Sequence, residues 1–378
     1  MAGLYIHIPF CASRCIYCGF YSTTKTNLQD RYVDAMCKEM ELRHNELVSA
    51  DRNITTIYIG GGTPSQLSLS NLQKIFTQIN NVWGNRVVAE EVTLECNPDD
   101  ITDEFAQAIS LLPINRVSMG AQTFNDDRLK FLHRRHRADE VKTAVSRLQK
   151  YGIKNISIDL MFGFPDESLN DWVSDINAAI SLGVQHISAY SLMYEEGTTL
   201  FKLLNQNKVK PVDEETSLAM YNMLIDHLSS AGYVQYEISN FALPGFQSKH
   251  NSSYWHDIPY IGIGASAHSY DITTRHWNVS DITKYISSIE SCTLPFEEEF
   301  IDKNTKYDDL ITTAMRTREG IDTAKLKADF GNDLYAYFMK EAVKHINRGT
   351  LQNVDGRVSL TRKGLFISDD IMSDLMHV

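Results

Sequence analysis

Three cysteines stand close together near the start of the chain, in the stretch "CASRCIYCGF". Cys11, Cys15 and Cys18 follow the spacing C-x3-C-x2-C. A structural zinc site takes four ligands, commonly from two C-x2-C pairs, whereas this stretch offers three thiolates and no histidine. A four-iron cluster fits the spacing better, because three cysteine ligands leave one iron open to a ligand that is not protein. Catalytic zinc with an open position is the alternative.

The chain's other cysteines are poorly placed to supply a fourth ligand. Six cysteines occur in 378 residues, and three of them lie outside the cluster. Cys37 falls in an amphipathic helical pattern, Cys96 follows Glu95 and so faces the other side of a strand, and Cys292 is distant in sequence. We expect all three to be small buried apolar side chains. So few cysteines in so long a chain do not indicate a disulfide framework.

The elements that must position the first three cysteines alternate along the chain. Short apolar segments typical of strands occupy 3–10, 55–62, 91–96, 115–122, 155–163 and 186–193. Stretches with apolar residues three and four apart, typical of helices, lie between them at 31–44, 70–80, 139–152 and 169–183. Six such units predict an α/β fold with a parallel sheet, either doubly wound or a partial (β/α)6 barrel of the TIM type.

Polar and flexible residues collect where these predicted strands end. The first strand runs into the cysteines, the second into "GGGTP" at 60–64, and the next three into Glu95, Gln122 and Asp159. Each of these alone is as consistent with a turn or a helix cap. Ligands of such folds bind beyond the carboxyl ends of the strands, so five of these strand ends together predict one binding edge.

Two further regions follow the six units. Residues 241–299 are dense in aromatic residues, histidine and glycine, and include "HNSSYW", from His250 to Trp255. Residues 300–378 carry charged helical patterns, a short hairpin pattern and a final helix. This order predicts a small α+β domain of the winged-helix type. We therefore expect a barrel over 1–240, a connecting region and a C-terminal domain.

Charge and hydropathy narrow the classes of function. The formal net charge is -12 and no helix rich in lysine and arginine stands out, which argues against binding nucleic acid. No apolar run approaches the ~20 residues needed to cross a bilayer, and the first residues lack the pattern of a signal peptide. We expect a cytoplasmic protein that holds any anionic ligand by local contacts.

The cysteine spacing resembles that of the radical S-adenosylmethionine (SAM) superfamily, in which an aromatic residue, here Tyr17, precedes the last cysteine. The resemblance implies a [4Fe-4S] cluster whose open iron is chelated by the methionyl amine and carboxylate of SAM. One electron from the cluster then cleaves SAM to methionine and a 5′-deoxyadenosyl radical. "GGGTP" is similar to the glycine stretch of that superfamily, and Glu95 to the acidic residue that binds SAM.

The resemblance covers essentially the whole chain, through "YIHIPFC", "YIGGGTPS", "LECNPDDI", "RVSMGAQTFNDDRLKFLHRRH", "ISIDLMFGFP", "YSLMYEEGT" and "EISNFA". It points to the branch that contains oxygen-independent coproporphyrinogen III oxidase and a related heme chaperone. It implies SAM contacts at Tyr5, Gly61, Gly62, Thr63, Gln122, Arg134 and Asp159. The guanidinium of Arg134 suits bidentate pairing with a methionyl carboxylate.

"HNSSYW" resembles the H-N-x-x-Y-W pattern of the chaperone, which implies heme contacts at His250, Asn251, Tyr254 and Trp255. Histidine is a common axial ligand of heme iron, and the two aromatic side chains offer flat apolar surface to a porphyrin. Three more histidines in this region are rivals for the same role: His256, His268 and His276.

Two functions of this branch are open. The oxidase uses the radical to decarboxylate propionate side chains to vinyl groups, whereas the chaperone passes heme to client hemoproteins such as respiratory enzymes. Three features favour the chaperone: only ten residues precede Cys11, Phe20 stands where the oxidase has a further cysteine, and "HNSSYW" is present. Expected partners are heme, SAM, clients and an electron donor for the cluster, with peripheral contact to membrane-bound clients. A metal-sensing interaction protein is the third alternative, but it would need a basic surface.

Overall fold

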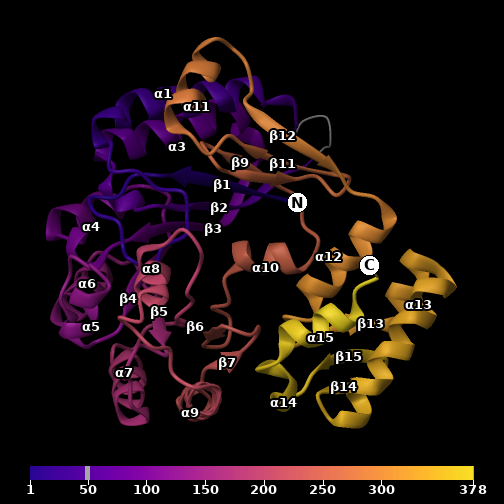
Figure 1. The fold of residues 1–378 in the computed structure, drawn as a ribbon. Helices are drawn as coiled ribbons and strands as arrows, with labels where there is room; N and C mark the ends of the chain where they lie inside the picture. Colours follow the sequence, from indigo (N-terminus) through magenta and orange to yellow (C-terminus); the bar gives the residue numbers. More distant parts are fainter. Residues whose placement is uncertain (47–51, 378) are drawn as a thin grey trace.

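Six parallel strands, each paired with the next in the chain, form the centre of the molecule (Figure 1). They are β1 (Ala2–Ile8), β2 (Ile54–Gly61), β3 (Val87–Cys96), β4 (Arg116–Gln122), β5 (Asn155–Phe162) and β6 (His186–Ser191). The structure is a computed structural model that describes residues 1–46 and 52–377. The prediction of an α/β fold with a partial barrel is confirmed, and all six strands lie where the apolar segments indicate.

Helices connect these strands and cover the outside of the sheet. The predicted ones are α1 (Gln29–Leu42), α3 (Leu69–Trp83), α6 (Ala138–Lys150) and α7 (Leu169–Ser181). A further long helix, α9 (Glu214–Ser230), follows the six strands. The shorter α4 (Asp103–Ile109), α5 (Asp126–Phe131) and α8 (Thr199–Asn205) have too few turns to show a period in the sequence. Single 3-10 turns lie at η1 (Thr26–Leu28), η2 (Pro64–Gln66), η3 (Gly84–Arg86) and η4 (Pro98–Asp100). Among the described residues, no helix has the length and apolar composition to cross a bilayer.

The region after the barrel units is less loop-rich than its sequence indicates. β9 (Tyr260–Ile263) pairs in parallel with β1, and β10 (His268–Tyr270), β11 (Thr274–Asn278) and β12 (Phe296–Phe300) continue the sheet in antiparallel fashion. At the other edge, β8 (Asn240–Ala242) pairs with β6 and with β7 (Val234–Gln235). The helices α10 (Lys249–Trp255) and α11 (Ile282–Glu290) also lie here. Residues 241–299 thus share the sheet and the main apolar core with the barrel.

The C-terminal region has its own apolar core and its own sheet. It consists of α12 (Lys303–Ala314), β13 (Ile321–Asp322), α13 (Thr323–Arg348), β14 (Leu351–Val354), β15 (Arg357–Leu360), α14 (Arg362–Leu365) and α15 (Ser368–Leu375). The three strands pair antiparallel in the order β13-β15-β14. Figure 1 shows this small α+β domain beside α10.

A buried ionic network joins α1 to the added strands. Glu39 and Arg43 are almost fully buried and pair at 3.2 Å. The Glu39 carboxylate also accepts hydrogen bonds from the Gly264 N–H at 2.9 Å, the Tyr285 hydroxyl at 2.5 Å and the Asn278 amide at 2.8 Å. Since each lone pair has a partner, this charge can be buried without an unsatisfied group.

We expect Glu39→Ala to lower the free energy of unfolding by about 3–5 kcal/mol, because it removes one of the two carboxylates that pair with the buried Arg43 and the acceptor of three further hydrogen bonds. Urea denaturation followed by circular dichroism measures this. Glu41→Ala, on the exposed face of the same helix, is the matched control. An equal, small loss in both variants would contradict the structural role of Glu39.

Candidate functional site

The three clustered cysteines lie in the loop that follows β1, at the carboxyl edge of the sheet, and all are partly exposed. The sulfur of Cys11 accepts a hydrogen bond from the Thr63 hydroxyl at 3.4 Å. The sulfur of Cys15 accepts one from the Arg134 guanidinium at 3.6 Å. The N–H of Cys18 donates to the Cys15 carbonyl at 3.3 Å. The loop thus holds its thiols beside one hydroxyl and one cation.

A buried spacer residue anchors this loop. Ile16, between the second and third cysteines, packs in a small apolar cluster with Leu132 and Leu200. Its N–H donates to the Leu132 carbonyl at 3.3 Å, and its carbonyl accepts from the Leu200 N–H at 2.8 Å. Because both backbone groups of Ile16 are hydrogen-bonded and its side chain is buried, the positions of the neighbouring Cys15 and Tyr17 along the loop are fixed.

Burial is the main cause that raises the pKa of Cys11 and of Cys18, so both thiols keep their protons when no cation is bound. Metal binding would release these protons. Over residues 1–46 and 52–377, no three His, Cys, Asp or Glu side chains converge as a single-ion site requires. A [4Fe-4S] cluster does not require such convergence, because each cysteine sulfur of its ligand set binds a different iron.

Of the remaining cysteines, Cys37 and Cys96 are buried, as expected. The same expectation is wrong for Cys292, which is exposed. Cys292 follows the end of α11 in a left-handed backbone conformation with φ 59°. A helix end at the surface leaves its side chain in solvent.

The glycine stretch at the end of β2 lies against neighbouring groups that leave no room for a side chain. A Cβ at Gly61 would lie 2.5 Å from the His7 ring, and the φ of Gly61 is +112°. A Cβ at Gly62 would lie 2.7 Å from the backbone of Pro9. Neighbouring atoms therefore require glycine at both positions, and the positive φ requires it at Gly61 as well. The partly exposed backbone of these two glycines, here called the glycine wall, lies next to the cysteine loop, since the following residue, Thr63, donates to Cys11.

Glu95, on β3, stabilises the glycine wall through a hydrogen bond. Its carboxylate accepts hydrogen bonds from the Tyr58 hydroxyl at 2.6 Å and from the Gly61 N–H at 3.0 Å. Burial raises the pKa of Glu95 to about 7, although both hydrogen bonds act in the other direction. Asp159 on β5 is close enough to add to the rise, and burial raises its own pKa too. The carboxyl groups of Glu95 on β3 and Asp159 on β5 thus lie close enough to interact at this end of the sheet.

Arg134 connects the cysteine loop to β4. Its Nη2 donates to the Asn97 side chain and to the Gly120 carbonyl, both at 2.7 Å. Its Nε is buried and has no hydrogen-bond partner among the described residues. A Cβ at Gly120 would lie 2.4 Å from the amide nitrogen of Gln122 and 3.2 Å from Arg134. Gln122 itself adopts a strained φ of 66°. The structure therefore brings both predicted residues to the same edge.

Three other predicted residues, Tyr5, Tyr17 and Phe20, differ in their burial and in their contacts. The Tyr5 hydroxyl hydrogen-bonds to His7 Nδ1 at 2.9 Å, and the Tyr5 ring stacks on Tyr58 with centroids 6.2 Å apart. Tyr17 is partly buried. Burial raises the pKa of its hydroxyl, although the nearby Arg134 acts in the opposite direction. Phe20, in contrast, is 72% exposed. Phe20 belongs to none of the apolar clusters that the described residues form.

Arg116 is a buried cation that sequence reasoning missed. It lies at the start of β4, is 1% exposed, and has an Nε and an Nη1 without hydrogen-bond partners in the part of the chain that the structure describes. Its charge opposes the rise in the pKa of both Glu95 and Asp159. The signal that could have identified it is an arginine within the predicted strand "NRVSMGAQ".

The "HNSSYW" segment forms α10, and Glu91 on β3 fixes its start. The Glu91 carboxylate accepts hydrogen bonds from the N–H groups of Lys249 and His250, both at 2.9 Å. Ser248 caps the helix by accepting from the N–H of Asn251 at 3.3 Å. The Lys249 ammonium pairs with Glu90. The Glu91 carboxylate on β3 thus positions the first turn of α10, which carries the "HNSSYW" motif.

The predicted ligand His250 is only 1% exposed, and both of its ring nitrogens are occupied. Nδ1 lies 2.9 Å from the Thr56 hydroxyl, and Nε2 lies 2.9 Å from the Tyr254 hydroxyl. Burial, aided by Arg116, lowers the pKa of His250 to about 3, so the ring is neutral at pH 7. Tyr254 and Trp255, in contrast, line a cavity between α10 and the C-terminal domain.

Comparison with known proteins identifies the family of the chain. Residues 5–179 match the model of the Radical SAM superfamily, and residues 301–367 match the HemN C-terminal domain. The chain is 33% identical over 373 residues to the heme chaperone HemW of Bacillus subtilis, covering 98% of both chains. It is 37% identical over 271 residues to the heme chaperone HemW of Escherichia coli, covering 70% of this chain and 69% of that one.

Among solved structures, the chain resembles the coproporphyrinogen III oxidase HemN of Escherichia coli, a radical SAM enzyme, with a TM-score of 0.84. This match covers 99% of this chain and 90% of that chain at 19% sequence identity. At this identity the likeness shows the fold alone.

The raised pKa of Glu95 predicts a specific pH dependence of stability. Between its ordinary value of 4.5 and about 7, the folded chain keeps a proton that the unfolded chain releases, so rising pH lowers the free energy of unfolding. Glu95→Gln cannot ionise, and its stability relative to wild type should rise across this window. Urea unfolding at pH 4.5 and pH 7.5 measures the difference. Glu297→Gln, at an exposed position, should show no such trend, and a constant difference for Glu95→Gln would contradict the assignment.

Proposed function

We propose that this chain, which belongs to the HemW family within the radical SAM superfamily, is a heme chaperone that binds a [4Fe-4S] cluster, SAM and heme and passes heme to client hemoproteins. The observation that carries the proposal is the 33% identity to a heme chaperone over 98% of both chains. The cysteine loop and the "HNSSYW" helix, which the two halves of the function need, are both present.

Cys11, Cys15 and Cys18 would hold the cluster. The loop geometry supports this, since all three thiols are partly exposed and a fixed Ile16 separates two of them. The group would supply one open iron for SAM and one electron. Arg134 already donates to Cys15, and such a donor near a cluster sulfur stabilises negative charge there.

The polar edge next to the cysteines would hold SAM. Gly61, Gly62 and Thr63 would lie against it with their backbone, and Glu95 and Asp159 would accept hydrogen bonds from ribose hydroxyls or from the methionyl amine. Arg134 has a buried Nε without a partner among the described residues, which suits pairing with the methionyl carboxylate. The other proposed contacts are Tyr5, Tyr17, Phe20 and Gln122.

The segment from His250 to Trp255 would form the heme site. Tyr254 and Trp255 line a cavity, and the buried Trp255 indole N–H has no partner among the described residues. A bound acceptor would satisfy it. Asn251 would contact the same ligand from the first turn of α10. We also propose that the chain acts in the cytoplasm, takes its electron from a separate donor, and meets membrane-bound clients peripherally.

The cluster assignment predicts about four irons per chain after anaerobic reconstitution with iron and sulfide. Replacing Cys11, Cys15 and Cys18 with serine should abolish iron binding and the brown colour, because the other three cysteines of the chain lie outside this loop. Cys292→Ser is the matched control and should keep both, since Cys292 is exposed and distant in sequence. A colourless product that contains zinc would overturn the assignment.

The chaperone and the oxidase predict different results from one reconstituted, reduced sample. With SAM and coproporphyrinogen III, we expect no protoporphyrinogen by chromatography. Loaded with heme and mixed with an apo-hemoprotein, the same sample should transfer heme, seen as a shift of the Soret band to that of the holo-client. The chain loaded with heme but not mixed is the control. Protoporphyrinogen formation without heme transfer would reverse the choice of function.

A further inference from the structure

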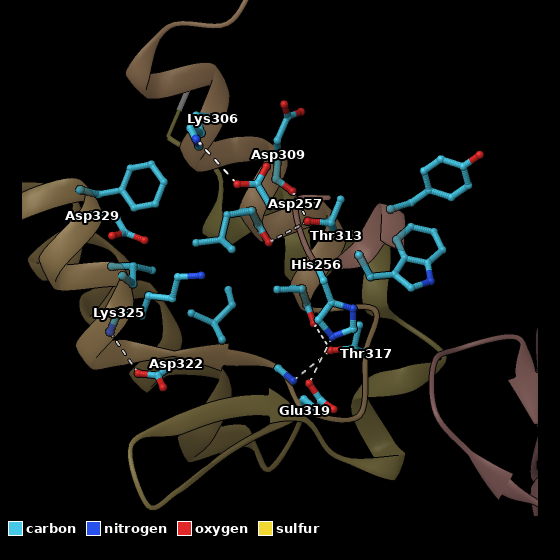
Figure 2. Close-up of a pocket in the computed structure, with 18 of the residues that line it drawn as sticks. His256, Asp257, Lys306, Asp309, Thr313, Thr317, Glu319, Asp322, Lys325 and Asp329 are labelled. Carbon is cyan, nitrogen blue, oxygen red and sulfur yellow. Dashed lines mark hydrogen bonds and ion pairs between the residues drawn. The ribbon is translucent and has the colours of Figure 1, made fainter. Parts of the chain in front are cut away.

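A cavity of about 720 Å³ lies between α10, the β10–β11 hairpin and the C-terminal domain. Figure 2 shows side chains from both parts of the chain pointing into it, among them His256, Lys325 and Thr313. Its volume is within the range of about 300–1,000 Å³ that is typical of cofactor and small-molecule sites.

We propose that this cavity is the metalloporphyrin site and that His256, which directly follows "HNSSYW", is the axial ligand of the iron. The proposal rests on the proposed function and deepens it, because it assigns the ligand and the site of the heme. It differs from the sequence-based prediction of His250.

The hydrogen bonding of His256 suits a metal ligand. Its Nδ1 donates to the Ser252 carbonyl at 2.7 Å, which fixes the tautomer and leaves the Nε2 lone pair for iron. The side chain is 49% exposed. His250 has the opposite properties, since it is buried and both of its nitrogens are engaged. His256 can therefore bind iron without unpacking α10.

The walls of the cavity suit a flat, mostly apolar molecule. Trp255 and Tyr270 line one side, and Leu310, Leu326 and Phe330 of the C-terminal domain also line it. Aromatic and branched side chains are the surfaces against which a porphyrin face loses water most favourably.

Among the described residues that line the cavity, the Lys325 ammonium is available to a propionate, and the Asp329 carboxylate is likewise in no ion pair. Asp309 pairs with Arg275 at 2.6 Å, and Asp257 lies 3.7 Å from Lys306. Lys325 extends into the cavity (Figure 2) and takes part in none of the close ion pairs among the described residues. Its ammonium would meet a heme propionate at the edge of the macrocycle.

The C-terminal domain holds the proposed ligand in a displaceable contact. Glu319 lies 3.3 Å from His256 Nε2, a contact that needs the protonated ring, whereas iron needs the Nε2 lone pair, so iron and the proton shared with Glu319 compete for the same nitrogen. In the same loop, the Arg316 guanidinium lies 5.2 Å from the centre of the Trp255 ring and 3.5 Å from Glu237. Heme entry thus replaces a weak, exposed ion pair with a metal bond.

His250 then has a positioning role. Its Nε2 lies 2.9 Å from the Tyr254 hydroxyl, and Tyr254 lines the cavity. Removing His250 would loosen Tyr254 and the end of α10, which weakens heme binding without changing the atom that binds iron.

Titration of ferric heme into the full, reconstituted chain tests the proposal through the Soret spectrum, the dissociation constant and electron paramagnetic resonance. We expect His256→Ala to lose the wild-type axial-ligand signature and to raise Kd by about tenfold or more, with the signature restored by added imidazole. His268→Ala, which also removes a cavity-lining histidine, is the matched control and should keep the wild-type signature. His250→Ala should raise Kd but keep it too.

Glu319→Gln tests the competition and should lower Kd by at most about fivefold, because exposed ion pairs contribute little. An unchanged signature in His256→Ala, or a signature lost in His250→Ala and restored there by imidazole, would overturn the assignment of His256. Loss in His268→Ala would give the ligand to that residue. If the wild type binds no heme at all, the proposed function itself fails, which is a separate result.

Discussion

The hydrogen bond from the Tyr58 hydroxyl to the buried Glu95 carboxylate, 2.6 Å long, is the interaction on which the site depends. Removing a carboxylate from water costs several kcal/mol unless its oxygens find donors. The second oxygen takes the Gly61 N–H, which requires the chain to turn at the end of β2. A Cβ at Gly60 would lie 2.6 Å from the Tyr58 ring, so this turn excludes larger residues. Glu95 thus fixes the Gly61 N–H in the glycine stretch beside the cysteines, and His7 and Pro9 exclude side chains from the rest of that stretch.

The ring of Tyr58 extends this constraint to α10. It stacks on His250 with centroids 5.2 Å apart, and His250 in turn contacts Tyr254 edge to face at 5.3 Å. Arg116 lies close enough to lower the pKa of His250 and to oppose the rise in the pKa of Glu95. The proposed SAM edge and the proposed heme cavity are therefore connected by a packed chain of aromatic rings and lie near the same buried cation.

The sequence predicts the long elements and the binding edge well, because six apolar strands each end in a polar or glycine-rich segment. It does not predict β9 to β11, since strands of three to five residues are too short to show alternation. It also cannot show that the His250 ring faces Thr56 and Tyr254. The motif specifies which residues are present, whereas the burial of His250 depends on its packing against β2 and β3, which are remote from it in sequence. For the same reason Arg116 was missed: its unpaired nitrogens are visible only once the barrel closes around them.

The construction of the cavity favours a carrier over an enzyme. A carrier must hold its cargo and then release it, so the ligand bond should compete with something the protein itself supplies. Glu319 supplies that competitor, and it belongs to the loop that also places Arg316 against Trp255. A client that moves this loop away from His256 or toward it would change the affinity for heme. Each exposed contact of the loop contributes a fraction of a kcal/mol to about 1 kcal/mol. Small coupled contacts of this kind permit transfer, whereas a closed, fully satisfied pocket would trap the heme.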